Sequence, residues 1–582
     1  MSNAASKTVP SKPVDDAPLP SMQPRVEQTL GNLLLSAAFA RPSADACVFP
    51  GERLRYRDLA AWAWRVARAL WVLGVRPRQH VGVLMTNSPE SIVSLFGVAL
   101  LGAVVVPLNT RYRPSELRFL CGDAKLAAIL VSGRDGDRGE LAQLVADALP
   151  ELARAADPGA LAIEAAPQLR AVVVFGSEGR AGMLAEAAFD ALAAGADHAR
   201  VARSAEAVAL RDVAAIVYSL GTASVPNGVV LTHEALVRGW TTVGRQWQIG
   251  ADDRLWSPCP LSHLSGLGPL ICTLAHGATY VSDRFFDAAR ALELIAAERV
   301  TMLHPLYPPI AEALLESPRF GEVDLSRVKL WLVVAPMQPL KQLARALPRA
   351  RLISTYGTPE SGPITMHDPA DEFDVRLATY GRALPGVEIR IVDRDTQAEL
   401  PAGRTGEIVY RGANSFSGYY NEPERTAAVI DADGWVHPGD LGMLDDEDRL
   451  VFHRRLDEAA ALDGAKTVPA EIEDFLGAHP AVKAVQVVAI PEPSVVEAVA
   501  AFVELHEHAE ATEDELIAYC RAHVSSFRVP QLVRFVNQWP SAMTNGRRQA
   551  LRERLVRELM AEPAMAVPRG SRARGAAAED FQ

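Results

Sequence analysis

Apolar residues along this chain form short unbroken runs that alternate with segments whose apolar spacing is near 3.6 residues. Residues 80–85 predict a buried strand, residues 89–101 a helix and residues 103–107 a second strand. Comparable apolar runs occupy residues 127–131, 171–175 and 214–218. Strands separated by helices predict βαβ units, and therefore largely parallel sheets with helices on their faces.

The pattern changes from about residue 381. Residues 387–393 and 406–411 largely alternate between apolar and polar side chains, and turn residues bound both runs, which predicts antiparallel strands. A compact α+β pattern follows residue 454. The predicted fold is therefore α/β, with a large N-terminal domain of mixed, largely parallel sheets flanked by helices, a small β subdomain, and a small, mobile α+β C-terminal domain.

The chain is too long for a single core, because its 582 residues exceed the usual size of one domain. In the C-terminal part, residues 482–490 and 499–505 are strand-like and residues 513–523 are helix-like. The first residues are rich in Pro, Ser, Ala and Asp, and the last in Arg, Gly and Ala, as in disordered ends. The predicted division is a disordered leader at 1–27, an N-terminal domain at 28–453, a hinge at 454–458, a C-terminal cap domain at 459–567 and a flexible tail at 568–582.

Composition narrows the function classes. Apolar residues make up 49% of the chain and charged residues 22%, as in ordinary soluble globular proteins. A net charge of −12 with both signs interspersed argues against a nucleic-acid partner, which requires a basic face. No apolar segment reaches the ~18 residues of a membrane span, and no signal peptide is recognised, so we expect a cytoplasmic protein without a transmembrane segment.

One loop carries a candidate chemistry. Residues 218–229 read Y-S-L-G-T-A-S-V-P-N-G-V and follow a predicted strand. Small residues let backbone N–H groups close on phosphate oxygens, so this run is typical of a phosphate-binding loop. A cation normally completes such a loop, but Asn227 stands where it is expected. The sequence therefore raises two questions: which enzyme the chain resembles, and whether it retains that chemistry.

Further motifs follow in a fixed order. They are G-A-V-V-V-P-L-N-T-R-Y from Gly102, P-L-S-H-L-S-G from Pro260, S-T-Y-G-T-P-E-S-G from Ser354, G-R-A-L-P-G-V-E from Gly381, D-G-W-V-H-P-G-D-L-G from Asp433, R-L-D-E from Arg455, V-P-A-E-I-E from Val468 and F-R-V-P from Phe527. Together with the loop they resemble the adenylate-forming (AMP-binding) superfamily, of the acyl-CoA synthetase or acid–thiol ligase type, over about residues 30–557.

The resemblance implies a reaction in two steps. A carboxylic acid attacks the α-phosphate of ATP and pyrophosphate leaves; the small C-terminal domain then rotates, and a thiol attacks the acyl-adenylate. The implied cofactors are ATP, Mg²⁺ and coenzyme A, or the phosphopantetheine of a separate carrier protein. Phosphoryl chemistry of this kind depends on positioning and on positive charge.

The resemblance also assigns residues to the phosphates and the metal. The hydroxyls of Ser219 and Thr222, with Gly221 in the same loop, would contact the β- and γ-phosphates. Glu360 together with Thr222 would hold Mg²⁺, a hard cation that prefers oxygen ligands. Taken alone, Glu360 would be an ordinary surface acid.

A second group of residues would bind the nucleoside. Tyr356 would stack near the adenine with Gly357 beside it, and Asp440 would accept hydrogen bonds from the two ribose hydroxyls. Arg455 would reach the ribose or a phosphate. Out of context, Asp440 would be a turn aspartate and Arg455 a solvated linker residue.

The remaining implied roles concern the reacting groups and the rotation. His263 would stand beside the carboxylate pocket, although a hydrogen-bonded loop histidine is the alternative interpretation. Asp457 would be the hinge, and Gly464 would lie in the loop that approaches the thiol's path. Arg547 or Arg548 would replace the catalytic lysine that bridges the carboxylate and the α-phosphate.

The departures from the family pattern fall on the parts that contact ATP. Besides Asn227, the chain has Val333 and Val334 in place of two glycines whose backbone passes the adenine, where β-carbons would crowd a flat ring. Pro359 replaces a threonine and so removes a hydroxyl and an N–H. The planar fork of Arg547 does not copy a compact ammonium.

Two functions therefore stay open. The first is an ATP-dependent acid–thiol ligase; the second is a non-catalytic or repurposed homologue that binds a partner, a ligand or a nucleotide without adenylating an acid. The predicted acid pocket, around residues 263–267, residues 306–310 and the stretch before Tyr356, is mostly apolar or small. An apolar acid, fatty or aryl, is therefore favoured over an amino acid.

Overall fold

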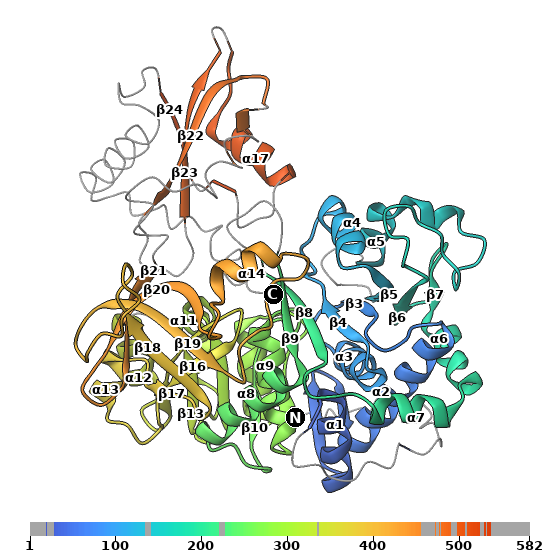
Figure 1. The fold of residues 1–582 in the computed structure, drawn as a ribbon, viewed down its shortest axis with the longest axis horizontal. Helices are drawn as coiled ribbons and strands as arrows, with labels where there is room; N and C mark the ends of the chain where they lie inside the picture. The colour runs from blue at the N-terminus through green and yellow to red at the C-terminus, as the bar shows by residue number, and fades with distance from the viewer. Residues whose placement is uncertain are drawn as a thin grey trace.

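The computed structural model describes residues 19, 28–133, 141–219, 227–334, 337–455, 472, 476–477, 479–490, 498–506, 509–523, 529–530 and 532–536. Figure 1 shows the first part of the chain, in blue and teal, beside the green-to-yellow second part, with a smaller C-terminal sheet apart from both.

The first large sheet is parallel except at one edge. Its spatial order is β7-β6-β5-β3-β4-β8-β9. The strands are β3 (His80–Leu84), β4 (Val104–Pro107), β5 (Leu126–Ser132), β6 (Ala171–Phe175), β7 (Leu184–Ala185), β8 (Val213–Ser219) and β9 (Asn227–Thr232). Only β8 and β9 pair antiparallel, and the last pair of their register is Ser219 with Asn227.

The second large sheet has the same character. Its spatial order is β14-β13-β12-β10-β11-β1-β2, and only β1 and β2 pair antiparallel. The strands are β1 (Asp45–Phe49), β2 (Glu52–Arg55), β10 (Arg254–Trp256), β11 (Thr279–Val281), β12 (Met302–Leu306), β13 (Leu330–Val333) and β14 (Arg351–Ile353). The predicted class of mixed, largely parallel sheets is confirmed.

Helices fill the space between the two sheets. They are α1 (Leu30–Ala40), α2 (Tyr56–Val72), α3 (Pro89–Leu101), α8 (His233–Gln246) and α9 (Leu264–Ala275), with α6 (Glu186–Leu192) and α7 (His198–Glu206) beside α2. One apolar core joins these helices to both sheets, through Val81 and Val105 of the first sheet and Tyr280 and Leu330 of the second. No helix in the described ranges is both long and apolar enough to cross a bilayer.

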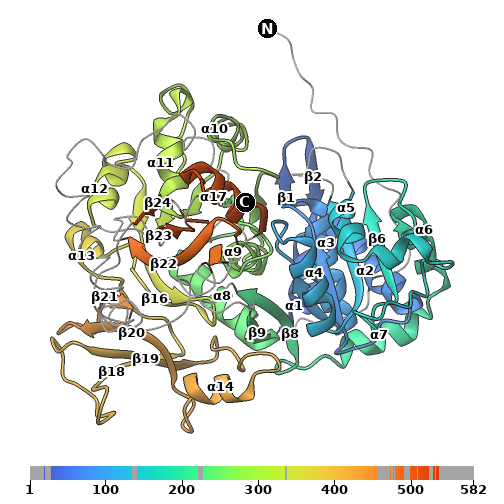
Figure 2. The same ribbon diagram turned by 90° about the horizontal axis from the view of Figure 1, so that it is seen from above.

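Other helices cover the outer faces of the sheets. The first sheet is covered by α4 (Pro114–Asp123) and α5 (Leu141–Ala148), and the second by α10 (Ala288–Ala297), α11 (Pro308–Glu316) and α12 (Met337–Ala346). Figure 2 shows α11 and α12 on the opposite side of the molecule from α6 and α7. The large domain is thus layered α/β/α/β/α, and each sheet is buried on both faces.

Local signals define α3 between its neighbouring strands. The Ser88 hydroxyl accepts a hydrogen bond from the backbone N of Ser91, and Pro89 is the first helical residue. The helix ends at Gly102, whose φ of 77° is left-handed, a conformation that costs glycine little. The signals for the start and the end of this helix are therefore local.

Smaller antiparallel sheets follow β14. The first contains β15 (Thr355–Thr358), β16 (Gly362–Met366) and β17 (Arg382–Ala383), and α13 (Phe373–Ala378) lies between β16 and β17 in the chain. The second contains β18 (Val387–Val392), β19 (Gly406–Gly412), β20 (Val436–Leu444) and β21 (Leu450–Arg455), with α14 (Pro423–Val429) before β20. The predicted antiparallel β subdomain is confirmed.

The C-terminal part has its own small sheet and core. Its elements are β22 (Val482–Ile490), β23 (Ala498–Leu505), β24 (Leu532–Phe535) and α17 (Glu513–His523). The Arg113 guanidinium before α4 donates a hydrogen bond to the carbonyl oxygen of Arg521 in α17. Residues 456–458 of the predicted hinge lie outside the described residues, so the domain boundaries stay a prediction.

His367 ties β16 to the connection between β14 and β15. Its Nδ1 accepts a hydrogen bond from the backbone N of Ser354 at 3.0 Å, and its Nε2 donates to the carbonyl oxygen of Thr379 at 2.8 Å. One ring nitrogen thus accepts a hydrogen bond while the other donates one, which only the neutral imidazole can do. Burial lowers the pKa of His367 from 6.5 to about 4.

We predict that the His367 contact is lost in acid. Because the pKa of His367 is lower in the folded than in the unfolded chain, the unfolded chain takes up the proton first as the pH falls. The contribution of the neutral His367 ring to the stability of the fold is therefore complete above about pH 6.5 and is lost as the pH falls through about 4. In His367→Gln the melting temperature should therefore fall less steeply between these pH values than in the unmodified protein. Circular dichroism melts across a pH series measure this, with the exposed His453→Gln as control. Equal slopes in all three proteins would contradict the prediction.

Candidate active site

The hairpin of β15 and β16 carries three of the predicted site residues. Tyr356 is buried and stacks on Phe452 of β21, with ring centroids 5.8 Å apart and an interplanar angle of 27°. Its hydroxyl donates a hydrogen bond to Asp440 Oδ2 at 2.6 Å. A β-carbon at Gly357 would lie 2.3 Å from the carbonyl oxygen of Gly362, so the hairpin requires glycine there. The hairpin backbone therefore fixes Tyr356 against Asp440.

Asp440 lies in β20, and its neighbour across the ladder is a second predicted residue. The register pairs Asp440 with Arg455 of β21 on one side and with Ile408 of β19 on the other. Asp440 is only 4% exposed, so its carboxylate is held by the protein rather than by bulk water. The structure thus brings the backbone of Arg455 beside the pair of Tyr356 and Asp440.

Glu360 lies in the turn between β15 and β16 and is half-buried. The Tyr419 hydroxyl donates a hydrogen bond to Glu360 Oε1 at 2.9 Å. Burial, followed by the negative charge of Glu360, raises the pKa of Tyr419 above its usual range. Tyr419 therefore stays a neutral hydrogen-bond donor to this carboxylate.

A chain of side chains continues from Tyr419 to the predicted phosphate-binding loop. The Arg425 guanidinium lies over the Tyr419 ring, 4.9 Å from its centroid, and Arg425 Nη1 donates to Asn227 Oδ1 at 2.6 Å. Asn227 opens β9, opposite Ser219 at the end of β8. Sequence reasoning missed Tyr419 and Arg425, because no local pattern in residues 417–425 indicates which strand they join.

His263 immediately precedes α9. Its Nε2 lies 3.2 Å from Asn109 Nδ2, an amide donor, in the loop after β4. Burial, and then the charge of Arg111, lower the pKa of His263 to about 4, so the ring is neutral at pH 7. The next residue, Leu264, packs near Gly362 of β16, which places α9 beside the hairpin that carries Glu360.

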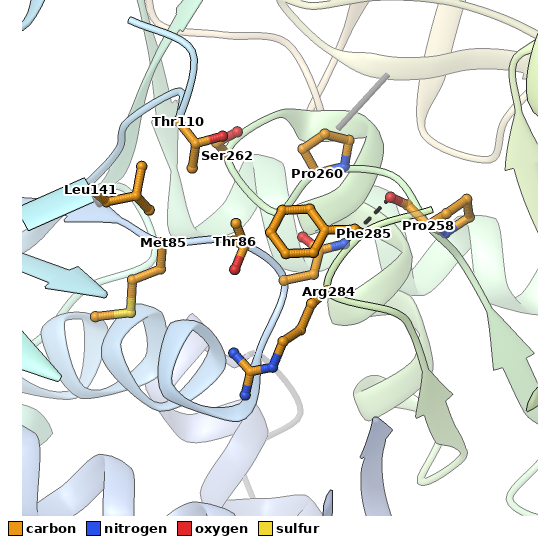
Figure 3. Close-up of a pocket in the computed structure, with 10 residues that line it drawn as sticks. Met85, Thr86, Thr110, Leu141, Pro258, Pro260, Ser262, Arg284 and Phe285 are labelled. Carbon is orange, nitrogen blue, oxygen red and sulfur yellow. Dashed lines mark hydrogen bonds between the residues drawn. The ribbon is translucent and has the colours of Figure 1, made fainter. Parts of the chain in front are cut away.

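A cleft lined in part by Ser262, the residue before His263, opens at the carboxyl ends of strands from both large sheets (Figure 3). Its lining follows β3, β4, β5, β10 and β11 and consists of Met85, Thr86, Asn87, Thr110, Leu141, Pro258, Pro260, Ser262, Arg284 and Phe285. Figure 3 shows Met85 and Leu141 on one side, with Pro258, Pro260 and Phe285 opposite. The carboxyl edge of parallel strands is the usual ligand-binding edge of such sheets. This cleft shares no residue with the predicted acid pocket at 263–267 and 306–310.

The two valines at the predicted adenine position face opposite sides of β13. Val333 is fully buried in the outer core with Trp331 and Leu352. Val334 is half-buried and packs against the inner core that contains Tyr356, while its backbone N donates to the carbonyl oxygen of Leu306 at 2.8 Å. Of the two side chains, only that of Val334 therefore lies on the face of Tyr356.

Several predicted site residues are not described at the level of side chains. Gly221, Thr222, Asp457, Gly464 and Arg547 lie outside the described residues, whereas Ser219 and Arg455 are placed by their backbones. The roles of all seven stay predictions.

The residues around Glu360 fit a magnesium ion that is bound by one protein carboxylate and takes most of its other ligands from water and substrate. Within the described ranges no group of three or more His, Cys, Asp or Glu could hold a metal without further ligands. Glu360 Oε1 is engaged by Tyr419, and no donor among the described residues hydrogen-bonds Oε2. One or two protein carboxylates completed by water and phosphate oxygens are the usual set for Mg²⁺.

The comparison with known families gives the class of the protein. A sequence model of the AMP-binding enzyme family matches residues 35–420, and one of the AMP-binding enzyme C-terminal domain matches residues 471–546. The chain therefore belongs to the AMP-binding enzyme family.

Individual relatives cover nearly the whole chain. YngI of Bacillus subtilis is 30% identical over 541 residues, which cover 91% of this chain and 98% of that protein. The 4-coumarate–CoA ligase 2 of Solanum tuberosum is 31% identical over 515 residues, covering 85% and 88%. The structure of amide bond synthetase McbA from Marinactinospora thermotolerans superposes with a TM-score of 0.73 at 26% identity, covering 90% of this chain and 99% of that one. Acid–CoA ligases are thus among the proteins that this chain is similar to.

Proposed function

We propose that this protein is an ATP-dependent acid–thiol ligase, which activates a carboxylic acid as an acyl-adenylate and transfers the acyl group to coenzyme A or a carrier thiol. The observation that carries the proposal is the buried contact of Tyr356 with Asp440, 2.6 Å between oxygens, directly across the β20–β21 ladder from Arg455. An ionised carboxylate accepts hydrogen bonds at both oxygens, as binding of two ribose hydroxyls requires. Tyr356 keeps that carboxylate in one orientation.

In the first step, a carboxylate oxygen of the acid attacks the α-phosphorus of ATP, and the bond from that phosphorus to the bridging oxygen breaks to release pyrophosphate. Asp440 and Arg455 hold the nucleoside, and Ser219, Gly221 and Thr222 contact the leaving phosphates. Mg²⁺ held by Glu360 would neutralise charge on the phosphate oxygens. His263 directly follows Ser262 of the cleft lining, and its neutral ring would orient the acid without adding charge.

In the second step, the thiol sulfur attacks the acyl carbon, the bond from that carbon to the AMP oxygen breaks, and the thiol proton is released. The C-terminal domain rotates about Asp457 so that Gly464 approaches the thiol, while Arg547 withdraws from the α-phosphate. Rotation lets one cleft serve both steps, because the first reaction takes place at the α-phosphorus and the second at the acyl carbon, and the two need different groups in the same cleft.

The cleft of Figure 3 favours an apolar acid or an amphiphilic acceptor chain. Apolar side chains such as Met85, Leu141 and Phe285 face the hydroxyls of Thr110 and Ser262. Arg284 is paired with Glu52 at 2.7 Å, so its charge is already compensated. A fatty or aryl acid fits this lining, and 4-coumarate, the substrate in the name of one relative, is an aryl acid.

The second candidate is a non-catalytic or repurposed homologue that binds a partner, a ligand or a nucleotide without adenylating an acid. The observation that favours it is Asn227, which carries no charge at the loop position where a cation is expected. Val334 and Pro359 add to it, since they change the predicted adenine pocket and the residue before Glu360. The two candidates differ in chemistry, because only the first breaks the α–β phosphate linkage.

The test is ATP–pyrophosphate exchange with separate pools of fatty, aryl and amino acids. We expect exchange that depends on acid and Mg²⁺, from a fatty or an aryl acid and not from amino acids. Exchange reports adenylate formation whatever the acceptor, and mass spectrometry of the product with coenzyme A then identifies the thioester. Absence of exchange from every pool, with no rise in melting temperature on adding ATP, would reject the ligase in favour of the second candidate.

A further inference from the structure

Arg425 of α14 contacts Asn227, near the end of the predicted phosphate-binding loop. We propose, building on the ligase function above, that Arg425 is a catalytic residue that contacts the β- and γ-phosphates of ATP and takes over the role of the cation missing at position 227. The contact that places it there is Arg425 Nη1 to Asn227 Oδ1, 2.6 Å across 198 residues of sequence.

The backbone fixes where Arg425 lies. Residues 417–420 run along β9 as an added strand: the backbone N of Val230 donates to the carbonyl oxygen of Gly418 at 3.0 Å, and that of Tyr420 to Gly228 at 2.7 Å. A β-carbon at Gly228 would lie 2.9 Å from Ile216 Cγ2 and 3.0 Å from Tyr420 Cβ, so the close approach needs glycine. Helix α14 begins directly after this strand, and Arg425 is in its first turn.

Two contacts then orient the guanidinium. The ring of Tyr419 lies beneath it, 4.9 Å from the centroid, and the Tyr419 hydroxyl is bound to Glu360 Oε1 at 2.9 Å. The arginine and the carboxylate predicted to hold Mg²⁺ therefore meet the same aromatic side chain. A phosphate chain that bridges a metal and a cation needs these two charges side by side.

Arg425 keeps its charge and most of its donors for a ligand. Within the described ranges no carboxylate forms an ion pair with Arg425, and its hydrogen-bond partner there is the amide of Asn227. A guanidinium has five N–H donors in a planar fork, so one can stay on Asn227 while others reach phosphate oxygens. Asn227 is 3% exposed and uncharged, so it holds the arginine without neutralising it. Because Asn227 is uncharged where a lysine is expected, the guanidinium of Arg425 from α14 can lie at this position without meeting a second cation.

The experiment measures nucleotide binding and exchange in six variants of the full chain. Arg425→Ala should weaken Mg–ATP binding, measured by calorimetry, by about tenfold to a hundredfold, as for loss of a charged hydrogen bond, and lower exchange at least as much. Binding of AMP should change less than twofold, because AMP lacks the β- and γ-phosphates. The Mg–ATP affinity of Arg425→Lys should lie between those of the unmodified protein and Arg425→Ala, since lysine keeps the charge but not the planar fork of donors.

A second test moves the positive charge from position 425 back to position 227. Asn227→Lys with Arg425→Ala returns an ammonium to the loop and should restore Mg–ATP binding to within a few-fold of the unmodified protein. Asn227→Lys alone should not improve binding, because it places two cations in contact. The matched control is Arg390→Ala, which removes an arginine lying 4.4 Å over the ring of Trp435 elsewhere in the β subdomain and should leave ATP binding unchanged.

The outcomes separate the inference from the function on which it rests. If the unmodified protein binds no ATP and shows no exchange, both fail. If it binds and exchanges while Arg425→Ala binds Mg–ATP equally well, the ligase stands and the role of Arg425 is overturned. Tighter ATP binding by Arg425→Ala would show that the arginine fills the phosphate position and closes it, which also overturns the inference. Arg425→Gln, which keeps a donor for Asn227, decides the question if the alanine variant melts lower.

Discussion

Asp440→Asn is expected to lower acid-dependent ATP–pyrophosphate exchange by on the order of 10²-fold, through the loss of charged hydrogen bonds to the ribose. Asparagine fills the same space, and its amide oxygen can still accept the Tyr356 hydroxyl that is now 2.6 Å from Asp440 Oδ2. The side chain loses its negative charge and one acceptor oxygen. The fold should therefore survive while nucleotide binding weakens.

The effect should appear in binding as well as in rate. AMP carries the ribose, so its affinity should fall in Asp440→Asn, whereas Arg425→Ala should spare it. Asp445→Asn is the matched control, because Asp445 is a turn aspartate in the same antiparallel sheet whose Oδ2 accepts from Arg449 at 2.7 Å. If Asp440→Asn is folded and its AMP affinity and exchange rate equal those of the unmodified protein, Asp440 is not part of the nucleotide site.

Trp331→Ala is expected to lower the free energy of unfolding of the large domain by about 3–5 kcal/mol. Trp331 is 1% exposed in the middle of β13, among Ile310, Val333 and Leu352 of the outer core. Removal of the indole leaves a cavity that the neighbouring strands and α11 can fill only in part, since interiors are close-packed. This is the largest single change in stability that we predict.

The midpoint of urea unfolding, followed by far-UV circular dichroism, measures this loss. Phe39→Ala is the control: it also deletes an aromatic ring, but Phe39 is 78% exposed at the end of α1, and its loss should change the free energy by no more than about 0.5 kcal/mol. Equal midpoints for the two variants would mean that β13 is not part of a cooperative core.

Local elements agreed closely with the sequence pattern. Residues 89–101 were predicted as a helix and are α3, and residues 513–523 were predicted as a helix and are α17. The buried strand predicted at 80–85 is β3, His80–Leu84, and that at 482–490 is β22, Val482–Ile490. These predictions succeed because caps, turn residues and apolar period are all written within a few neighbouring residues.

The site was predictable as separate motifs and not as an arrangement. Tyr356, Glu360 and Asp440 were each chosen from a motif, but their contacts with Phe452 and Tyr419 were not foreseen. The two valines were treated alike in the sequence, although strand alternation buries Val333 in the outer core and leaves Val334 on the face of Tyr356. Which face of β13 belongs to the site depends on helices far away in the chain.

The sequence by itself therefore determined the α/β class, the boundaries of its best-defined elements, the family and the missing lysine at Asn227. Only the tertiary structure decided that Arg425 meets Asn227 and that a cleft forms where five strand ends converge. The physical reason is that helix caps and apolar period act within one or two turns, whereas the pairing of residues 417–420 with β9 closes a loop of nearly 200 residues. Such pairing follows from the hydrogen bonds of the assembled sheets, and no local pattern encodes it.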